Sequence, residues 1–404
     1  MLGCDPHVRK PQMDIIQKRI GIVGGGQLGK MMILEAKRLG YYVAILDPTK
    51  DCPAHSICDH HIVASFRDPK GYHELSVLTD VITYEFEHIN AEVLETLEKE
   101  GRLVYPSVTA LKTIQNKYTQ KAALRAGAIP IPRFTKVSTA EDIRKFEKTE
   151  SLGYPLMLKT TTGGYDGKGN AVIKTEAGIE EALDALGGGE KELMLEEYIT
   201  FKKEISIIAC RGTDGERTLY PVAENRHVNS ILDTTIVPAG IDGRTGEKAS
   251  AIAAEVMRVF EGVGAFCIEM FVTESGDICV NEVAPRPHNS GHYTIEACFA
   301  NQFENHIRAI VGLPFGDTSL RTPAVMVNLL GESDGAAKLS GLEEAYKDPN
   351  VHVHLYGKKE SKTGRKMGHY TVVGDTVEEA LNRAQELKSV LSVVGENKIG
   401  ESRV

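Results

Sequence analysis

The sequence predicts a mixed α/β and α+β protein, in which a doubly wound parallel sheet is followed by units with antiparallel sheets. Up to about Pro106, short apolar runs alternate with helical segments, which is the βαβ pattern of a parallel sheet. From about Lys117, strand-like runs follow one another through short turns, a pattern typical of hairpins. At roughly 100 to 200 residues per domain, the chain of 404 residues predicts two to four domains.

The first domain is expected over residues 18–116, after an N-terminal extension over residues 1–17. Five apolar runs supply its strands: RIGIVG, YVAILD, HIVAS, VITYEF and LVYP. Apolar residues between Leu28 and Leu39 recur on one side of a helix after the first strand, and Gly40 suits its C-cap. Ligands of doubly wound sheets bind at the carboxyl ends of the strands, where GGGQLG and TYEFE both lie.

The loop in RIGIVGGGQLGKMM fits one nucleotide-binding pattern and nearly fits a second. Gly24, Gly26 and Gly29 match the G-x-G-x-x-G turn of dinucleotide-binding folds, and Asp47 lies near where such folds bind ribose hydroxyls. The spacing also resembles a P-loop, but Met31 stands where that motif needs a hydroxyl for magnesium. The pattern alone therefore leaves open NAD, as in an oxidoreductase, the phosphates of ATP, or another ligand.

The second domain is expected over residues 117–313, with a lid subdomain at about 122–190, and a small C-terminal domain over residues 314–404. Strand-like runs in the second domain are LMLK, NAVIK, LMLEEYI, EISIIAC, LYPVAEN, AFCIEMFVT and DICVNEVA. The third contains AVMVNLLG, VHVHLYG and GHYTVVG, with an amphipathic helix near Val377 to Lys388. Hairpins dominate the second domain, which predicts antiparallel sheets.

A second glycine-rich loop lies in LMLKTTTGGYDGKGNAVIK, between two strand-like runs. Its glycines are Gly163, Gly164, Gly167 and Gly169. Glycine lets a loop fold closely over a ligand and turn backbone N–H groups toward phosphate oxygens. Lys159, which ends the preceding strand, and Lys168 in the loop would add positive charge. The alternative is a flexible hairpin tip, but two positioned lysines are more than a turn needs.

The run LMLEEYI ends an apolar strand with two carboxylates, Glu196 and Glu197, and Glu204 follows across FKKE. Such acceptors would suit an adenine amine or a ribose hydroxyl, while Tyr198 and Ile199 could offer backbone contacts. Edge strands also carry charges that prevent aggregation, so this pattern alone is weak evidence for a nucleotide.

The segment AFCIEMFVTESGDICVNEVA predicts a metal site. A two-residue turn at Ser275-Gly276 would pair Glu274 with Asp277 and place Glu269 opposite Glu282. Two carboxylates directly across a hairpin repel each other unless a cation lies between them. Mg²⁺ takes one or two carboxylates and completes its shell with water and substrate phosphates. The prediction depends on the register, because a slip of one residue would separate the pair.

Two other segments could bring charge to an anionic substrate. The loop APRPHNSGHY, which two prolines stiffen, holds Arg286, His288, Asn289 and His292, and a rigid loop keeps a guanidinium aimed at a phosphate. A structural role is expected for one of the two histidines. In LYGKKESKTGRKMGH the basic residues are Lys358, Lys359, Lys362, Arg365 and Lys366. The alternative for this cluster is a solvated loop.

Composition excludes several classes of protein. The formal net charge of −9 argues against a general nucleic-acid binder. No apolar run approaches the ~18 residues of a membrane span, and the N-terminus lacks the apolar core of a signal peptide, which predicts a cytoplasmic protein without membrane contact. The seven scattered cysteines predict reduced thiols. The segment CPAHSICDHH lacks the ligand spacing of structural zinc sites, so we do not expect metal there.

Several motifs together resemble the ATP-grasp ligases, and within them the bacterial 5-(carboxyamino)imidazole ribonucleotide synthetases, from about Lys18 to the C-terminal end. They are GGGQLG, TYEFE, KTTTGGYDGKGN, LEEYI, NEVAPRPHNSGHYTIEAC and GRKMGH. The resemblance implies an ATP-grasp fold with an N-terminal pre-ATP-grasp domain, a two-lobed ATP-grasp unit and a small C-terminal domain. It also implies ATP- and bicarbonate-dependent carboxylation of 5-aminoimidazole ribonucleotide through carboxyphosphate in purine biosynthesis.

The resemblance assigns roles to residues of this chain. Lys159, Arg286 and His288 are expected to be catalytic, and Glu269 and Glu282 to bind Mg²⁺, with Mn²⁺ as an alternative. ATP is expected to contact Lys117, Lys159, Gly164, Tyr165, Asp166, Gly167, Lys168, Gly169, Asn170, Glu196, Glu197, Tyr198, Ile199, Glu204, His227, Asn281 and Glu282. The ribonucleotide is expected to contact Gln27, Leu28, Glu85, Tyr165, Asp166, Arg286, His288, Lys358 and Arg365.

The same resemblance gives the first glycine loop a ligand, the phosphate of the ribonucleotide at the N-terminus of the helix that begins near Leu28. It also implies a homodimer. Lys117 stands where the family often has Arg, which keeps the charge but not a two-pronged phosphate contact. Three rival functions remain at this point: a nicotinamide-dependent oxidoreductase that uses the first glycine loop, a formate-dependent ATP-grasp ligase acting on glycinamide ribonucleotide, and a catalytically silent nucleotide sensor or assembly module.

Overall fold

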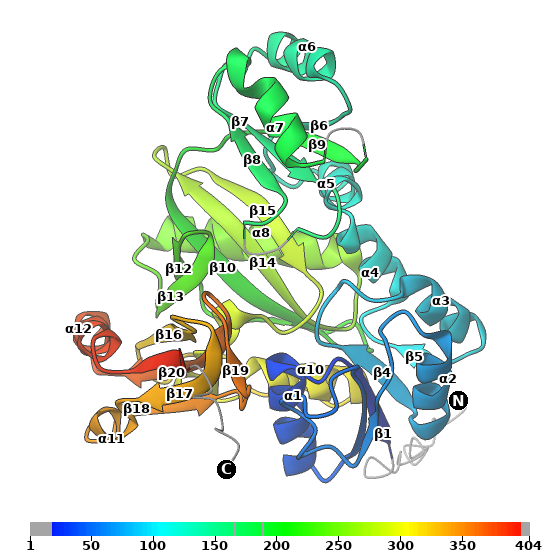
Figure 1. Ribbon diagram of the computed structural model, residues 1–404, viewed down its shortest axis with the longest axis vertical. Helices are drawn as coiled ribbons and strands as arrows, with labels where there is room; N and C mark the ends of the chain where they lie inside the picture. Colours follow the sequence, from blue (N-terminus) through cyan, green and yellow to red (C-terminus); the bar gives the residue numbers. More distant parts are fainter. Residues whose placement is uncertain (1–17, 165–166, 188–189, 397–404) are drawn as a thin grey trace, which may run out of the picture.

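The computed structural model describes residues 18–164, 167–187 and 190–396 (Figure 1). The expected extension, together with Tyr165 and Asp166, lies outside these residues. No helix in the described ranges is long and apolar enough to cross a membrane. The six cysteines in the same ranges are unpaired thiols.

The N-terminal part is a parallel sheet, as predicted. Its strands are β1 (Arg19–Val23), β2 (Tyr42–Leu46), β3 (His60–Ile62), β4 (Val81–Tyr84) and β5 (Leu103–Val104), in the order β3-β2-β1-β4-β5. Helix α1 (Gln27–Arg38) packs on one face with α10 (Gln302–Val311), and α2 (Pro69–Leu78) and α3 (Ala91–Lys99) cover the other. Because both faces are covered, the strands are apolar almost throughout.

A small lobe at the top of Figure 1 carries the second glycine loop. Its sheet has the order β6-β9-β7-β8, from β6 (Phe134–Val137), β7 (Leu156–Thr160), β8 (Asn170–Ile173) and β9 (Leu193–Glu197). Helices α6 (Ala140–Glu150) and α7 (Ile179–Ala185), which follows the 3-10 turn η2 (Glu176–Gly178), share one apolar core with this sheet. Helices α4 (Val108–Gln115) and α5 (Lys117–Ala126) connect the lobe to the first sheet.

The largest sheet is antiparallel and spans the centre of the molecule (Figure 1). Its order is β15-β14-β10-β12-β13-β16-β20-β18, with β11 beside β10. Its strands are β10 (Phe201–Arg211), β11 (Arg217–Leu219), β12 (Ala223–Val228), β13 (Ile231–Val237), β14 (Gly264–Thr273), β15 (Ile278–Ala284), β16 (Ala324–Leu330), β18 (Val351–Leu355) and β20 (Lys366–Val373).

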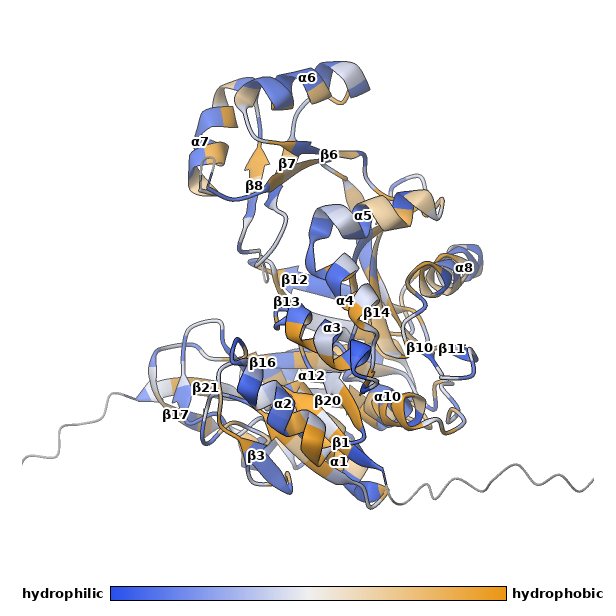
Figure 2. Cartoon of the chain, turned by 90° about the vertical axis from the view of Figure 1, so that its right-hand side faces the viewer, coloured by the Kyte–Doolittle hydropathy of each residue, from blue (hydrophilic) through white to orange (hydrophobic). Residues whose placement is uncertain are grey.

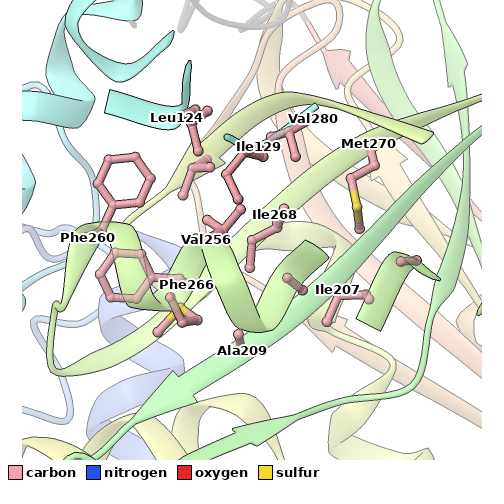
Figure 3. Packing of buried hydrophobic residues seen from close by; sticks show 14 of the residues in the cluster. Leu124, Ile129, Ile207, Ala209, Val256, Phe260, Phe266, Ile268, Met270 and Val280 are labelled. Carbon is pink, nitrogen blue, oxygen red and sulfur yellow. The ribbon is translucent and has the colours of Figure 1, made fainter. Parts of the chain in front are cut away.

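Helices cover this sheet and join it to the first one. Helix α8 (Gly243–Phe260) packs against β10 and β14 through buried residues such as Val256, Phe266 and Ile268 (Figure 3). After β15, the 3-10 turn η3 (Asn289–Gly291) and the short helix α9 (Thr294–Ala297) lead to α10, which contacts both sheets. The loop between β15 and η3 is therefore held between the two sheets.

The C-terminal part adds a three-stranded sheet of β17 (Gly335–Ser340), β19 (Glu360–Ser361) and β21 (Ser392–Glu396). The expected helix is α12 (Val377–Lys388), which packs on β16 and β20, while α11 (Leu342–Ala345) is a single turn. Strand β16 pairs with β13, so the units expected before and after residue 314 share one continuous sheet. Figure 2 shows the small lobe standing apart from the other sheets.

Candidate active site

One cavity of about 790 Å³ collects most of the predicted site residues from the small lobe, the central sheet and the first sheet. The predicted residues that line it are Gln27, Leu28, Glu85, Lys117, Lys159, Gly164, Gly167, Lys168, Asn170, Glu196, Glu197, Tyr198, Ile199, Glu204, His227, Glu269, Asn281, Glu282, Arg286 and His288. Gly169, Lys358 and Arg365 do not line it. The cavity therefore joins the groups expected for ATP to most of those expected for the ribonucleotide.

The first glycine loop is closed over a carboxylate of the protein itself. Glu85, which follows β4, accepts hydrogen bonds from the backbone N–H groups of Gly26 at 2.5 Å and Gly29 at 2.6 Å. Asp47 accepts from the N–H of Gly25 at 2.8 Å. A Cβ atom on Gly24, whose φ is +106°, would collide with the Glu85 side chain. The glycines are therefore needed for this close approach.

This arrangement narrows the phosphate interpretation of the loop. Glu85 already binds the amides of Gly26 and Gly29, so a phosphate at the start of α1 would have to use those of Gln27 and Leu28, the residues predicted to contact the ribonucleotide. The glycine pattern predicted the helix N-terminus correctly, but it could not show that the anion paired with it comes from a distant loop of the same chain. Gln27, Leu28 and Glu85 line the cavity, and their contact with substrate stays a prediction.

Two lysines converge on Glu196 near the end of β9. Lys159 Nζ lies 2.6 Å from its Oε2, and Lys121 Nζ lies 3.3 Å from its Oε1, an ion pair that lacks hydrogen-bond geometry. Although burial opposes ionisation, the two ammonium groups lower the pKa of Glu196 to about 2. Sequence reasoning missed Lys121, because the spacing within α5 gives no sign that this lysine is buried.

Glu204 and Glu197, two other acids predicted to contact ATP, also have basic partners. Glu204 pairs with His227, and although burial lowers the pKa of this imidazole, the carboxylate outweighs it and raises the pKa. Glu197 pairs with Arg133 at 2.9 Å. Because Glu204 and His227 come from the adjacent strands β10 and β12, the central sheet holds them together at the cavity wall.

The predicted pairing of Glu269 with Glu282 is confirmed, but the predicted register of the turn is wrong. Near the turn, Val272 pairs with Ile278, which is one residue away from the register of a two-residue turn. A β-bulge after Glu269 leaves Asn281 as the extra residue and restores the opposition of the two glutamates. The bulge also breaks the strand alternation, so Asn281 and Glu282 both line the cavity.

The two glutamates form a site with excess negative charge. Burial and the neighbouring Glu282 carboxylate raise the pKa of Glu269 to about 7. On the other side, Lys117 donates to Glu282 Oε1 at 2.6 Å, and although burial lowers the pKa of the lysine, this contact raises it overall. Opposed carboxylate oxygens with the Asn281 amide beside them are suitable ligands for Mg²⁺ or Mn²⁺. The residues present therefore fit a divalent cation.

Arg286 does not present an open guanidinium to the cavity. Its Nε and Nη2 donate to the two carboxylate oxygens of Glu87 at 2.6 and 3.2 Å, and Nη1 donates to the carbonyl of Pro287 at 3.2 Å. Although burial opposes it, this pairing lowers the pKa of Glu87 to about 2. The expectation of a two-pronged grip on a substrate phosphate is corrected here, because the fork is used on Glu87. Sequence reasoning placed Glu87 at the sheet edge without a role, since 199 residues separate it from Arg286.

The two histidines of the same loop lie in different surroundings. His288 lines the cavity, and so does the neighbouring Asn289. His292 is buried, and its ring stacks on that of His369 with centroids 4.5 Å apart. Burial lowers the pKa of His292 well below its usual range. The structure therefore places one histidine at the cavity and packs the other in the interior.

In the basic cluster between Lys358 and Lys366, the residue that lines the cavity is not one of those predicted to bind the substrate. Lys358 donates to the carbonyl of Lys366 at 2.7 Å, and burial together with Arg365 lowers its pKa to about 8. Arg365 donates to the carbonyl of Glu360 at 2.8 Å. Lys366, at the start of β20, lines the cavity instead. The sequence showed the cluster, but only the pairing of β20 with β16 decides which lysine points inward.

The segment CPAHSICDHH comes closer to a metal-binding geometry than its spacing predicted. Asp47, Cys52 and His61 offer ligand atoms within 4.8 Å of one another. The Asp47 carboxylate, however, accepts from the backbone of Gly25 and Thr49 at 2.8 Å each. Burial and the Asp47 charge raise the pKa of the Cys52 thiol to about 11, which opposes the thiolate form that binds metals.

Three domain families match this chain in the order that the fold shows. The ribonucleotide synthetase preATP-grasp domain matches residues 17–115, the ATP-grasp domain residues 122–303, and the phosphoribosylaminoimidazole carboxylase C-terminal domain residues 324–383. A lid with a glycine loop, facing paired glutamates on an antiparallel sheet, is the arrangement of an ATP-grasp ligase, and this chain is one.

Similar proteins narrow the assignment. The N5-carboxyaminoimidazole ribonucleotide synthase of Bacillus subtilis is 44% identical over 87% of this chain and 90% of its own length. The crystal structure of the Thermotoga maritima synthetase is 46% identical, covers 94% of this chain and 100% of its own, and has a TM-score of 0.85. The Aspergillus clavatus synthase, solved with ADP and 5-aminoimidazole ribonucleotide, is 36% identical over 93% of this chain and 98% of its own, with a TM-score of 0.85. The chain belongs to the N5-carboxyaminoimidazole ribonucleotide synthase family.

Proposed function

We propose that this protein uses ATP and bicarbonate to carboxylate the exocyclic amine of 5-aminoimidazole ribonucleotide, giving the 5-(carboxyamino) product, ADP and phosphate, as a step of purine biosynthesis. One observation carries the proposal: a single cavity is lined by Lys159 of the small lobe, by the opposed Glu269 and Glu282, and by the loop after β4. ATP and a second substrate can therefore meet in one cavity. The Aspergillus clavatus relative, solved with ADP and the aminoimidazole ribonucleotide, supports this pairing of ligands.

The reaction we propose has two steps. A bicarbonate oxygen attacks the γ-phosphorus, the bond to the β-phosphate oxygen breaks, and carboxyphosphate and ADP form. The substrate amine then attacks the carboxyl carbon, or carbon dioxide released from it, and the C–N bond forms as phosphate leaves and the amine gives up a proton. Such phosphoryl transfer depends on positioning and on neutralising charge rather than on covalent help from the protein.

The charged side chains of the cavity would divide these tasks. Lys159, which now pairs with Glu196, and Lys117, which pairs with Glu282, would also contact the ATP phosphates. Arg286, already fixed by Glu87, would add positive charge near the carboxylate oxygens, and His288 would lie beside them. The lobe that carries the second glycine loop would cover the phosphates and exclude water, since carboxyphosphate hydrolyses readily.

Glu269 and Glu282 would hold Mg²⁺, with Mn²⁺ as an alternative, and the bound ion would supply positive charge at the phosphate oxygens. The site residues assigned to ATP and to the ribonucleotide belong to this proposal, including Gly169, Lys358 and Arg365, which do not line the cavity. We also propose a homodimer acting in the cytoplasm, without nucleic acid or membrane partners. Sedimentation of the purified protein tests the dimer.

The test of the function is ADP release with each candidate amine, in the presence and absence of bicarbonate. We expect turnover that requires both 5-aminoimidazole ribonucleotide and bicarbonate. A formate-dependent ligase would instead turn over glycinamide ribonucleotide with formate and ignore bicarbonate. That result would overturn the substrate assignment while leaving the ATP site intact, and the absence of ADP release with every amine would favour a nucleotide sensor.

A further inference from the structure

His288 turns one ring nitrogen toward the cavity and the other into the protein. Its Nε2 lies 3.8 Å from Glu269 Oε1 at the cavity wall. Its Nδ1 lies 3.0 Å from the hydroxyl of Ser290 and 3.3 Å from the backbone nitrogen of Ser290. The two nitrogens of an imidazole differ in whether they carry the proton, so the inner contacts decide which of them does.

The backbone contact has a fixed direction. The Ser290 N–H can only donate, so His288 Nδ1 carries no hydrogen of its own while it accepts this bond. Gln302 holds the backbone of His288 from both sides, because its Oε1 accepts from the His288 N–H at 2.9 Å and its Nε2 donates to the His288 carbonyl at 2.7 Å. The position of the ring relative to Ser290 is therefore set by the main chain.

The Ser290 hydroxyl is oriented by a chain of buried hydrogen bonds that points the same way. Thr235 donates to the Asn225 carbonyl oxygen at 3.0 Å, Asn225 donates to the Ser206 hydroxyl at 2.9 Å, and Ser206 donates to the Ser290 hydroxyl at 2.9 Å. Since the Ser290 oxygen accepts from Ser206, its own hydrogen is directed to His288 Nδ1, a stronger acceptor than the Cys267 sulfur at 3.5 Å. The side chains of Thr235, Asn225, Ser206 and Ser290 are at most 5% exposed, and of the four only Asn225 lines the cavity.

We infer that His288 is held as the tautomer with its proton on Nε2, and that Ser290 is the positioning residue that holds it so. His288 then faces the cavity as a hydrogen-bond donor to an anionic oxygen of the ligand, and not as a general base. The catalytic part of this inference rests on the proposed function, whereas the tautomer itself follows from this chain's own contacts.

The tautomer is measured directly by nitrogen-15 NMR of the protein labelled at the histidine rings. The His288 signals are those that disappear in the His288→Gln variant. We expect one protonated nitrogen, at Nε2, and an unprotonated Nδ1 that accepts hydrogen bonds. A proton on Nδ1 would overturn the inference. If the native protein does not turn over the aminoimidazole substrate, the proposed function fails, and the NMR result still decides the tautomer.

Ser290→Ala tests the positioning role. The backbone N–H of residue 290 remains in this variant and still favours the proton on Nε2, so we expect that tautomer to stay in the majority, with a detectable fraction protonated on Nδ1 that the native protein lacks. We expect a kcat about tenfold lower and an unchanged KM for ATP, an effect of the size seen when the hydrogen-bond partner of a metal-binding histidine is removed. Ser206→Ala should give a smaller shift in the same direction, and it replaces Ser290→Ala if that variant does not fold.

Ser76→Ala is the matched control, because that buried hydroxyl donates to the His73 carbonyl of α2 at 2.7 Å, away from the cavity. We expect it to keep the native kcat and the native His288 signals. If Ser290→Ala and Ser206→Ala behave like Ser76→Ala, with lower stability but unchanged kcat and tautomer, Ser290 is not a positioning residue.

Discussion

The loop at Gly24 to Gly29 and the loop that begins at Gly163 both place glycines beside a lysine. A carboxylate of the protein faces the first loop, whereas the second lies beside lysines at the cavity. At the first loop, the Glu85 carboxylate binds the backbone amides of Gly26 and Gly29. The described part of the second loop lines a cavity together with Lys159 and Lys168. The first loop therefore contains its own anion, whereas the second faces a space large enough to receive one from a ligand.

This difference shows what a glycine pattern can and cannot specify. Glycine allows positive φ and close approach, so the pattern predicts backbone shape at both loops. It does not predict which anion the amides bind, because Glu85 is distant in sequence from the loop that it fills. Changes at the open site should therefore alter ligand binding and catalysis, and changes at the filled loop should alter stability.

The largest effect is expected at the metal-binding end of the open site. Glu282→Gln removes one of two opposed carboxylates and should lower the rate of ADP release about 10³-fold, because charge on the phosphates loses several kcal/mol of stabilisation. The fold should remain intact, since Gln keeps the size of the side chain. Glu274→Gln, an exposed change in the same hairpin, is the control and should behave as the native protein. Full activity of Glu282→Gln at ordinary Mg²⁺ would contradict the metal assignment.

The next effect is expected at the filled loop, and it is an effect on stability. Glu85→Ala leaves two backbone amides without their acceptor and should lower the free energy of unfolding by about 2 to 3 kcal/mol. Burial raises the pKa of Glu85, which offsets part of the benefit of the two hydrogen bonds, so a larger loss is not expected. Denaturant melts measure the change, with Glu92→Ala on the exposed side of α3 as control. Equal midpoints for Glu85→Ala and Glu92→Ala would show that the first loop does not depend on its anion.

A third prediction uses pH. Burial and Glu282 raise the pKa of Glu269 from 4.5 to about 7, so between these values the cation-free protein holds a proton there that the unfolded chain has lost. The stability of the cation-free protein should fall as pH rises through that window, because the folded state binds more protons. A cation must displace the same proton, so Mn²⁺ affinity, followed by electron paramagnetic resonance, should weaken about tenfold per pH unit below pH 7. Affinity that does not change with pH across this window, or a slope that persists in Glu269→Gln, would count against this carboxylate as the ligand.

The sequence predicted the fold well because the fold follows local patterns. The five parallel strands, the hairpins of the second domain and the helix at Val377 to Lys388 all come from apolar periodicity and turn residues. The strand β13 was missed, because its run ILDTTIV mixes polar residues with apolar ones. The joining of β13 to β16, which places the expected second and third units in one sheet, depends on contacts that no local pattern encodes.

The site was predicted in part, and the failures have one cause. Opposition of Glu269 and Glu282 needed only the hairpin, although a bulge rather than a two-residue turn produces it. The pairing of Arg286 with Glu87 and that of Glu85 with the first loop join segments that are far apart in the chain. Each of these pairings uses a charge that sequence reasoning had left available for a ligand. Motifs gave the residue types at the site, whereas long-range contacts decided which of them face the cavity.

The most direct test of the difference between the two glycine loops, the first bound to Glu85 and the second open to the cavity, compares the lysine beside each loop. Lys159 lines the cavity, and Lys30, at the P-loop position of the first loop, donates to the Leu355 carbonyl at 3.3 Å. Binding of a non-hydrolysable ATP analogue is measured by calorimetry for Lys159→Met and Lys30→Met. We expect the first change to weaken binding about thirtyfold, as loss of a charged hydrogen bond does, and the second to leave affinity within about twofold. Weakened binding in Lys30→Met with native affinity in Lys159→Met would place ATP at the first loop and contradict the account.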